Sequence, residues 1–410
     1  MSQTEVQLIK ADAVQTGDIA NSAVTDAKIS GVASSKLTGA LPAISGAALT
    51  NLPASGKAHN LIINGAMQVA QRGTSTTSPG YGTVDRYKLL TNGCDDAPTQ
   101  SQADVASGTT PYTLGFRKSY KITNGNQTSG AGAADYIFFR QQLEAQDIAN
   151  SGWNYLSSSS NITLSFWVKS SVAQNFYGYV RSHDGTSYVY PFETGALTAD
   201  TWTKVTKTIP GNSNLQFDND INTGFGVNFA PFQGTDYTAS SVTLNAWAAY
   251  ASGTKAPDYT STWFTTNNAT FEITGLQLEV GSVATDFEHR SFGQELALCQ
   301  RYYQQYTNIM SVGYVPNNVS KSYSHGFNLP VEMRAAPTLT ISNTGSTAGQ
   351  YVTDGDTNRN VSSLDSHASQ TYQIEYYFNL SGDLSDFRGA YAVSSTSTTH
   401  QTTYYITAEL

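Results

Sequence analysis

Alternation of apolar and polar residues along short segments constrains this chain more than any other feature of its sequence. In the segment ITLSFWVKSS, residues 162–171, the apolar positions are Ile162, Leu164, Phe166 and Val168. Successive side chains of a β-strand point to opposite faces, so this period predicts a strand with one buried face. Similar segments recur along most of the chain, and the sequence therefore predicts an all-β protein.

Residues 58–290 are expected to form one β-sandwich. The segment NFYGYVRSHDGTSYVY places a HDGT turn between two aromatic-rich runs, which is a hairpin pattern. In NATFEITGLQLEVG, Gly275 shifts the phase of the alternation, as a β-bulge does. Short strands separated by frequent turn residues are typical of sandwich folds.

One segment, SFGQELALCQRYYQQY at residues 291–306, has helical spacing instead. Ser291 and Gln294 fit a capping box, which predicts that a helix begins there. Four apolar positions spaced by 4, 3 and 4 residues form its predicted seam: Phe292, Leu296, Cys299 and Tyr303. Residues 291–309 are therefore predicted to be a helical joint, which either pairs with copies from sister chains or docks on its own sandwich.

Residues 310–410 return to strand patterns and are long enough for a small, sandwich-like β-domain. The clearest strands are NLPVEMRAAPTLTIS, TYQIEYYFNLS, FRGAYAVSS and TTYYITAEL. In TYQIEYYFNLS, one face carries Tyr372, Ile374, Tyr376 and Phe378, and the other carries Gln373, Glu375 and Tyr377.

The first 57 residues contain no aromatic residue and carry a short repeat, AVQTGDI followed by AVTDAKI and the looser VASSKL. Each copy has two apolar residues five positions apart, a spacing that fits neither a strand nor a helix. These positions are Val14, Ile19, Val24, Ile29, Val32 and Leu37. A repeat that cannot close its own core needs neighbours. Either this segment is disordered, or copies from several chains share their apolar residues in a shaft.

Charge and hydropathy exclude two classes of partner. The net charge is −9, and no cluster of Lys and Arg provides the surface that a nucleic-acid backbone requires. No apolar run approaches the roughly 20 residues of a membrane span, and the first residues lack the pattern of a secretory signal. We therefore expect neither nucleic-acid binding nor membrane insertion.

Motifs for catalysis, metals and cofactors are missing from the sequence. There is no GxSxG elbow, the six His form no HExxH set, and the distant Cys94 and Cys299 are expected to be reduced thiols. Neighbouring carboxylates such as Asp218 and Asp220 suit turns, with a structural Ca²⁺ as the alternative. The sequence predicts no enzyme activity, no cofactor and no metal site.

Several long segments together resemble bacteriophage tail-fibre proteins. They are HNLIINGAMQVAQRGTSTTSPGYGTVDRYKL, FEITGLQLEVGSVATDFEHRSFGQELALCQRYYQQY, LPVEMRAAPTLTIS and the ending ITAEL. The resemblance covers residues 58–410, and the front repeats are similar to those of trimeric fibre shafts. It implies that residues 58–290 are a jelly roll similar to carbohydrate-binding modules, in which ITLSFWVKS pairs with TADTWTKVTKTIPG.

The resemblance also implies a function. Such a chain is made in the host cytoplasm, forms a homotrimer in the virion, attaches to the tail or baseplate by its N-terminal residues 1–57, and recognises a glycan or protein on a bacterial surface. The alternatives are a purely structural collar or decoration fibre, and a polysaccharide depolymerase. The same trimer is expected to bury the repeat positions and the helical seam.

Aromatic side chains on strands are the candidates for glycan binding, because flat rings pack against the C–H faces of sugars. In the sandwich they lie on the faces opposite the apolar residues of their strands, and in the terminal domain they are tyrosines. The candidates are Trp167, Tyr177, Tyr179, Tyr351, Tyr372, Tyr377 and Tyr404.

Overall fold

The computed structural model describes residues 60–307, 311–315, 319–342, 350–353, 358–384, 388–394 and 403–410. All of them belong to one compact unit, Pro53–Leu410. The predicted shaft, with its six apolar repeat positions from Val14 to Leu37, lies outside the described residues.

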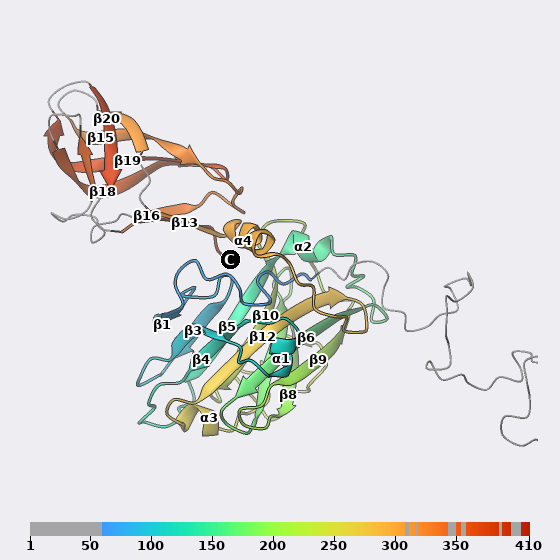
Figure 1. Cartoon of the computed structure of the whole chain (residues 1–410). Helices are drawn as coiled ribbons and strands as arrows, with labels where there is room; N and C mark the ends of the chain where they lie inside the picture. The colour runs from blue at the N-terminus through green and yellow to red at the C-terminus, as the bar shows by residue number, and fades with distance from the viewer. Residues whose placement is uncertain are drawn as a thin grey trace, which may run out of the picture. The chain divides into compact units, whose positions relative to one another are not determined.

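Two six-stranded antiparallel sheets form a jelly-roll sandwich, and the predicted fold class is confirmed (Figure 1). Sheet A has the order β1–β3–β4–β12–β6–β9. Its strands are β1 (Ser75–Thr76), β3 (Thr99–Asp104), β4 (Lys118–Thr123), β12 (Thr270–Val280), β6 (Asn161–Ser170) and β9 (Thr203–Pro210).

Sheet B has the order β11–β8–β7–β10–β5–β2. Its strands are β11 (Ala248–Ala249), β8 (Tyr188–Ala196), β7 (Asn175–Ser182), β10 (Thr223–Gln233), β5 (Tyr136–Glu144) and β2 (Lys88–Asn92). The expected hairpin is β7 paired with β8, and the strand pair implied by the family resemblance is β6 with β9.

The core between the sheets follows the alternation read from the sequence. Ile162, Leu164, Phe166 and Val168 of β6 are all 0% exposed. They face Phe176, Val180 and Phe192 of sheet B in one continuous apolar cluster. The bulge predicted at Gly275 is present, because the register of β12 with β6 shifts between Thr274 and Gln277. Gly275 has φ +61°, a conformation that glycine adopts without steric cost.

The predicted helix is shorter than its apolar pattern. Helix α4 (Phe292–Gln300) begins with the expected capping box of Ser291 and Gln294. The helix ends at Gln300. Tyr303 instead begins strand β13 (Tyr303–Thr307), which pairs with residues 403–407 near the C-terminus. The prediction of one helix to residue 306 is therefore wrong, because sheet pairing outweighs helical spacing beyond Arg301.

Three shorter helices lie in the sandwich: α1 (Thr110–Thr113), α2 (Ala145–Ala149) and α3 (Thr262–Thr265). In the part of the chain that the structure describes, no helix has the length and apolar character needed to cross a bilayer.

The C-terminal region contains a closed β-barrel, whereas the sequence predicted two facing sheets. Six strands form a closed antiparallel barrel in the order β14–β15–β19–β18–β17–β20. They are β14 (Ser311–Val315), β15 (Val319–Asn328), β19 (Gln373–Leu384), β18 (Asn358–Ser369), β17 (Gln350–Thr353) and β20 (Arg388–Ser394).

A three-stranded sheet combines one strand before the barrel in sequence, one between β15 and β17, and one after the barrel. It has the order β13–β21–β16, with β16 (Thr338–Ile341) and β21 (Thr403–Thr407). Ile374, Tyr376 and Phe378 of the barrel are buried, as their alternation predicts, in one cluster with Tyr404 and Ile406.

Candidate functional site

The outer face of sheet B carries a row of polar and aromatic side chains. Phe176 and Val180 point into the core, so the odd positions of β7, including Tyr179, point outward. Tyr179 is the register neighbour of Asn228 on β10, which in turn neighbours Arg140 on β5. Lys88 extends this row on one side and Pro191 on the other.

A second row crosses the same face two residues further along the strands. Gln142 of β5 neighbours Gly226 of β10, and Gly226 neighbours Arg181 of β7. Gly226 contributes no side chain, and His183 Nε2 would lie 3.2 Å from a Cβ atom at this position. His183 therefore leans over the middle of the row, between the two arginine-bearing strands.

The segment after β10 contacts this outer face. The Tyr259 hydroxyl donates a hydrogen bond to the Tyr177 carbonyl oxygen at 3.2 Å. The Arg181 guanidinium lies 3.5 Å from the ring centroid of Tyr250, and the Lys255 ammonium lies 4.3 Å from that of Tyr237. These contacts hold basic and aromatic side chains together beside the two rows.

Burial and neighbouring cations lower the pKa of two basic groups on this face. Burial, with smaller contributions from Arg181 and Arg140, lowers the pKa of His183 to about 4. Burial and Arg181 lower the pKa of Lys255 to about 8. His183 is therefore neutral at pH 7, and Lys255 is the basic group on this face closest to losing its proton.

Two of the predicted glycan-binding residues lie on this face, and they differ in exposure. Tyr177 is partly exposed and packs edge-on against Tyr259, with ring centroids 5.0 Å apart. Tyr179 is only 4% exposed, so its ring is not the open platform that the prediction requires. Burial also raises the pKa of its hydroxyl, so neither the ring nor the hydroxyl is open to a ligand on sheet B.

Trp167 lies on the other side of the sandwich. It projects from the outer face of sheet A and lines a cavity of about 280 Å³ with Phe116, Phe287 and His289. A single platform of Trp167, Tyr177 and Tyr179 is therefore impossible, because strand alternation places residues of both sheets outward but on opposite faces.

The candidate tyrosines of the C-terminal region also separate. Tyr404 is 0% exposed in the apolar cluster, so it is a core residue. Tyr372 is 57% exposed just before β19, and Tyr377 on β19 is partly exposed. Tyr351 lies on β17, where the structure describes the backbone only. Of these four, Tyr372 has the most accessible ring.

The predicted helical seam is largely turned into its own chain. Cys299 is 0% exposed and Tyr303 is 4% exposed, so neither can contact a sister chain. Helix α4 docks on its own sandwich, because Glu295 accepts the Asn64 N–H at 2.5 Å from within that core. Leu296 is partly exposed, and Phe292 is 56% exposed at the start of the helix.

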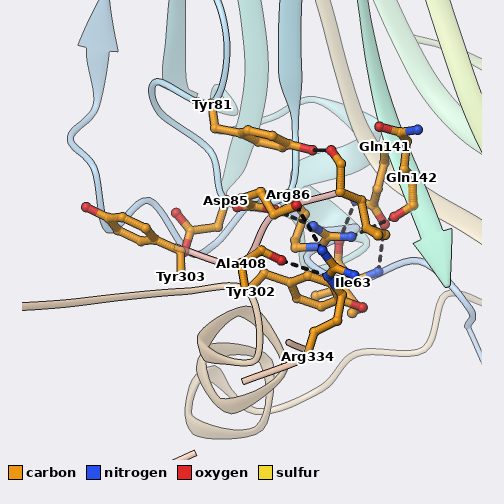
Figure 2. Close-up of polar contacts among 12 residues, drawn as sticks. Ile63, Tyr81, Asp85, Arg86, Gln141, Gln142, Tyr302, Tyr303, Arg334 and Ala408 are labelled. Carbon is orange, nitrogen blue, oxygen red and sulfur yellow. Dashed lines mark hydrogen bonds and ion pairs between the residues drawn. The ribbon is translucent and has the colours of Figure 1, made fainter. Parts of the chain in front are cut away.

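The last three residues of the chain bind the sandwich through buried charges (Figure 2). The Arg86 guanidinium is 1% exposed, pairs with the Glu409 carboxylate and donates to the Gln142 carbonyl oxygen at 2.6 Å. It also lies 3.3 Å from the ring centroid of Tyr302. The Tyr81 hydroxyl donates to the Leu410 carbonyl oxygen at 2.7 Å. We call this group of contacts the Glu409 joint.

Further ion pairs reinforce the Glu409 joint. Arg72 pairs with Glu409 at 3.0 Å, and Arg334 Nε donates to the Ala408 carbonyl oxygen at 2.7 Å. Close to it, the Arg301 guanidinium donates two hydrogen bonds of 2.8 Å to the Glu144 carboxylate. Bidentate pairs of this kind fix orientation as well as distance. The three-stranded sheet is thus tied to the sandwich at defined atoms.

Carboxylates elsewhere serve loops. Asp95 accepts hydrogen bonds from Ser129, and Asp220 accepts them from Asn222. The thiols Cys94 and Cys299 are free, as expected. Within the described ranges, no three His, Cys, Asp or Glu side chains gather as metal ligands would.

Sequence reasoning missed the charged residues of both regions. Arg86 stands in VDRYKL and Glu409 in ITAEL, two segments quoted for the family resemblance without a role for their charges. Arg140 and Arg181 stand at outward positions of predictable strands. Alternation could have placed them on outer faces, but no pattern within one strand could have paired them.

Comparison with known proteins assigns no family. No protein-family model matches the chain, and the curated proteins contain no match.

Solved structures with some similarity include a protein from Bacteroides thetaiotaomicron described as sugar binding, with a TM-score of 0.30 and 12% identity over 54% of this chain and 100% of that chain. The enzymatically active domain of tailspike protein 4 from bacteriophage CBA120 has a TM-score of 0.29 and 11% identity over 54% of this chain and 21% of that chain. A cellulose-binding domain of a Cellulomonas fimi glucanase has a TM-score of 0.25 and 11% identity, over 53% and 99% respectively. These values are too low to place the chain in a family.

Proposed function

We propose that this chain is a bacteriophage tail-fibre protein that recognises a glycan on the bacterial surface. Residues 58–410 resemble such fibres in several long segments. The observation that carries the proposal is the outer face of sheet B, where the partly exposed Arg140, Tyr177 and Arg181 project from strands β5 and β7. Hydrogen-bonding side chains beside aromatic rings are the groups that orient a sugar.

In this proposal the fibre is a homotrimer in the virion, anchored to tail or baseplate proteins by residues 1–57. Phe292 supports the assembly, because a 56%-exposed phenylalanine at the start of α4 is apolar surface that a neighbouring chain could cover. Three copies would raise the avidity of weak sites by about 10² to 10⁴. Light scattering on the full chain should give three times 44.0 kDa, and a monomer at micromolar concentration would contradict the assembly.

Adsorption tests the function itself. Purified fibre should compete with phage for host cells in proportion to its concentration, because both occupy the same receptor. The test variant is Arg140→Gln, which removes a partly exposed guanidinium from the row. Competition that is unchanged by this substitution would mean that sheet B is not the receptor site.

A structural fibre without receptor affinity is the second candidate, and the Glu409 joint favours it. Charges buried between two parts of the chain suit a rigid spacer as well as an adhesin. A fibre that is needed for particle assembly but never competes for host cells would support this alternative.

The proposed fibre has no catalytic activity. Incubation with envelope polysaccharide from several hosts should release no reducing ends. Release that depends on a specific carboxylate would instead identify a depolymerase.

A further inference from the structure

Four basic side chains on or beside the outer face of sheet B lack acidic partners: Lys88, Arg140, Arg181 and Lys255. Among the described residues, none of the ion pairs includes any of them. The Glu409 carboxylate acts on Lys88 but already pairs with Arg86 and Arg72, and the Glu193 carboxylate, beside Tyr177, accepts a hydrogen bond from Asn175. In a chain of net charge −9, this face is a local reversal of sign.

The register of the strands brings these cations together. Lys88 and Arg140 are direct neighbours on β2 and β5, and like charges so placed repel each other. Arg181 lies in the adjacent row on β7, beyond Gly226. Gly226 has no side chain, and His183 Nε2 and Asn228 Nδ2 would lie 3.2 Å and 3.5 Å from a Cβ atom there.

Several polar atoms of this face have no hydrogen-bond partner. Arg140 Nε, Gln142 Oε1 and both polar side-chain atoms of Gln233 are buried and unpaired. Gln142 is 5% exposed and Gln233 is 1% exposed, so little water reaches them. Buried donors and acceptors without partners are costly to the fold, but a bound molecule can reach only the partly exposed Arg140 and Arg181 beside them.

The protonation states indicate the same charge preference. His183 and Lys255 both have a lowered pKa, in part because Arg181 lies nearby. An anion bound among these groups would reverse that effect and raise both pKa values. Binding should therefore draw protons from solution near pH 8, where Lys255 is half protonated.

We propose that the outer face of sheet B binds an acidic polysaccharide, whose anionic groups pair with the partly exposed Arg140 and Arg181. This inference rests on the proposed glycan recognition and specifies the class of glycan. Guanidinium groups are suited to carboxylate, phosphate and sulfate alike, because their parallel N–H donors match two oxygens of one group.

Isothermal titration calorimetry on the full chain tests this with three named probes. They are polygalacturonate as a carboxylated chain, dextran sulfate as a sulfated chain, and dextran as a neutral chain. We expect at least one acidic probe to bind and dextran to bind at least about tenfold more weakly. The preferred acidic probe then identifies the anionic group. At pH 8, the heat of binding should change with the ionisation enthalpy of the buffer, because protons are taken up.

Two variants locate the site. Arg140→Gln and Arg181→Gln should each weaken binding of the acidic probe by about tenfold, the usual effect of losing one charge-assisted hydrogen bond. Lys121→Gln removes the same charge from β4 on the opposite sheet and should leave affinity unchanged. Thermal melts of all three confirm that each remains folded.

The outcomes separate this inference from the proposed function. Equal affinity for dextran and polygalacturonate would overturn the acidic preference and leave glycan recognition intact. Equal losses in the Lys121→Gln and Arg140→Gln variants would overturn the location on sheet B. Single-stranded DNA that binds as tightly as the best acidic polysaccharide would show attraction to any polyanion and would also overturn it.

Discussion

The two sheets of the sandwich differ in how their central cations are paired, although Lys121 and Lys204 of sheet A also belong to no ion pair of the described residues. On sheet A, Lys169 pairs with Glu272 at 3.0 Å and Lys118 pairs with Asp104 at 2.6 Å. On sheet B, Arg140 and Arg181 belong to none of the ion pairs found in the described residues. Cations that pair with carboxylates of the same chain stabilise the fold, whereas unpaired cations on the surface are available to a ligand.

The Glu409 joint shows what pairing achieves at the edge of sheet B. Arg86 is more deeply buried than any cation of the outer face, and it is the one with a carboxylate partner and an aromatic ring. A buried charge without a partner is strongly destabilising, so a cation as deeply buried as Arg86 needs a carboxylate partner. This contrast orders the expected effects of substitution from large to small.

The largest effect is expected at Glu409. Glu409→Gln leaves Arg86, which is 1% exposed, without a countercharge and should lower the free energy of unfolding by about 3 to 5 kcal/mol. Urea denaturation followed by tryptophan fluorescence measures the loss. The matched control is Asp104→Asn, which breaks a pair whose carboxylate is 82% exposed and should cost less than about 1 kcal/mol. Equal losses would remove the distinction between buried and exposed pairs.

His183 provides the next largest effect, through pH. Its folded pKa of about 4 lies below the roughly 6.5 of an unfolded histidine, so the unfolded state binds more protons between these values. Stability contributed by neutral His183 is therefore complete above about pH 6.5 and is lost as pH falls towards 4. Allowing for partial exposure, the loss is about 2 kcal/mol.

The measurement is the difference in stability between the wild-type chain and His183→Gln across that range of pH. Subtraction is needed because Asp85, whose pKa burial raises to about 6, acts in the opposite direction. For that carboxyl group the folded state binds more protons, so its contribution falls as pH rises from about 4 to 6. A difference that is constant with pH would show that neither burial nor the cations of sheet B lower the pKa of His183.

On sheet A, Glu272→Gln should have a smaller effect. The carboxylate accepts from the Ser119 hydroxyl at 3.0 Å and pairs with Lys169, whose side chain is 23% exposed. Glutamine keeps the hydrogen bond and loses the charge, so we expect a cost of about 1 kcal/mol in urea denaturation. The double variant with Lys169→Gln should recover part of this cost, and failure to recover any would mean that the two residues do not interact.

The sequence predicted the sandwich because its strands are amphipathic, and burial of one face determines their register. Phe166 and Ile374 were placed correctly for that reason alone. The helical seam failed at Tyr303 because spacings of three and four residues also occur by chance where a strand follows a helix. Local pattern cannot weigh a helical turn against pairing with β21, about 100 residues away in sequence.

The candidate site was predictable only in part. Outward positions such as Tyr177 follow from alternation, but alternation does not say which outer face a strand contributes to. Trp167 and Tyr179 were therefore assigned to one platform although they lie on different sheets. The cation pattern depends on strand order, since Arg140 and Arg181 become near neighbours only when β10 lies between β5 and β7. Strand order is not encoded in any short segment.

The smallest effect on stability is expected at Arg140, and this residue gives the most direct test of the comparison between the two faces. Arg140→Gln breaks no ion pair found in the described residues, removes a buried Nε that has no partner and relieves repulsion with Lys88. Burial and Arg140 together lower the pKa of Lys88, so this substitution should raise that pKa. The free energy of unfolding should stay within about 0.5 kcal/mol of the wild type or rise. Urea denaturation and an NMR titration of Lys88 measure the two effects.

A loss of more than about 1 kcal/mol would mean that Arg140 already has an anionic partner within the folded chain, because only a lost partner costs that much at a partly exposed position. In that case the cations of sheet B would be neutralised like those of sheet A, and this face would have no unpaired charge to offer an acidic glycan.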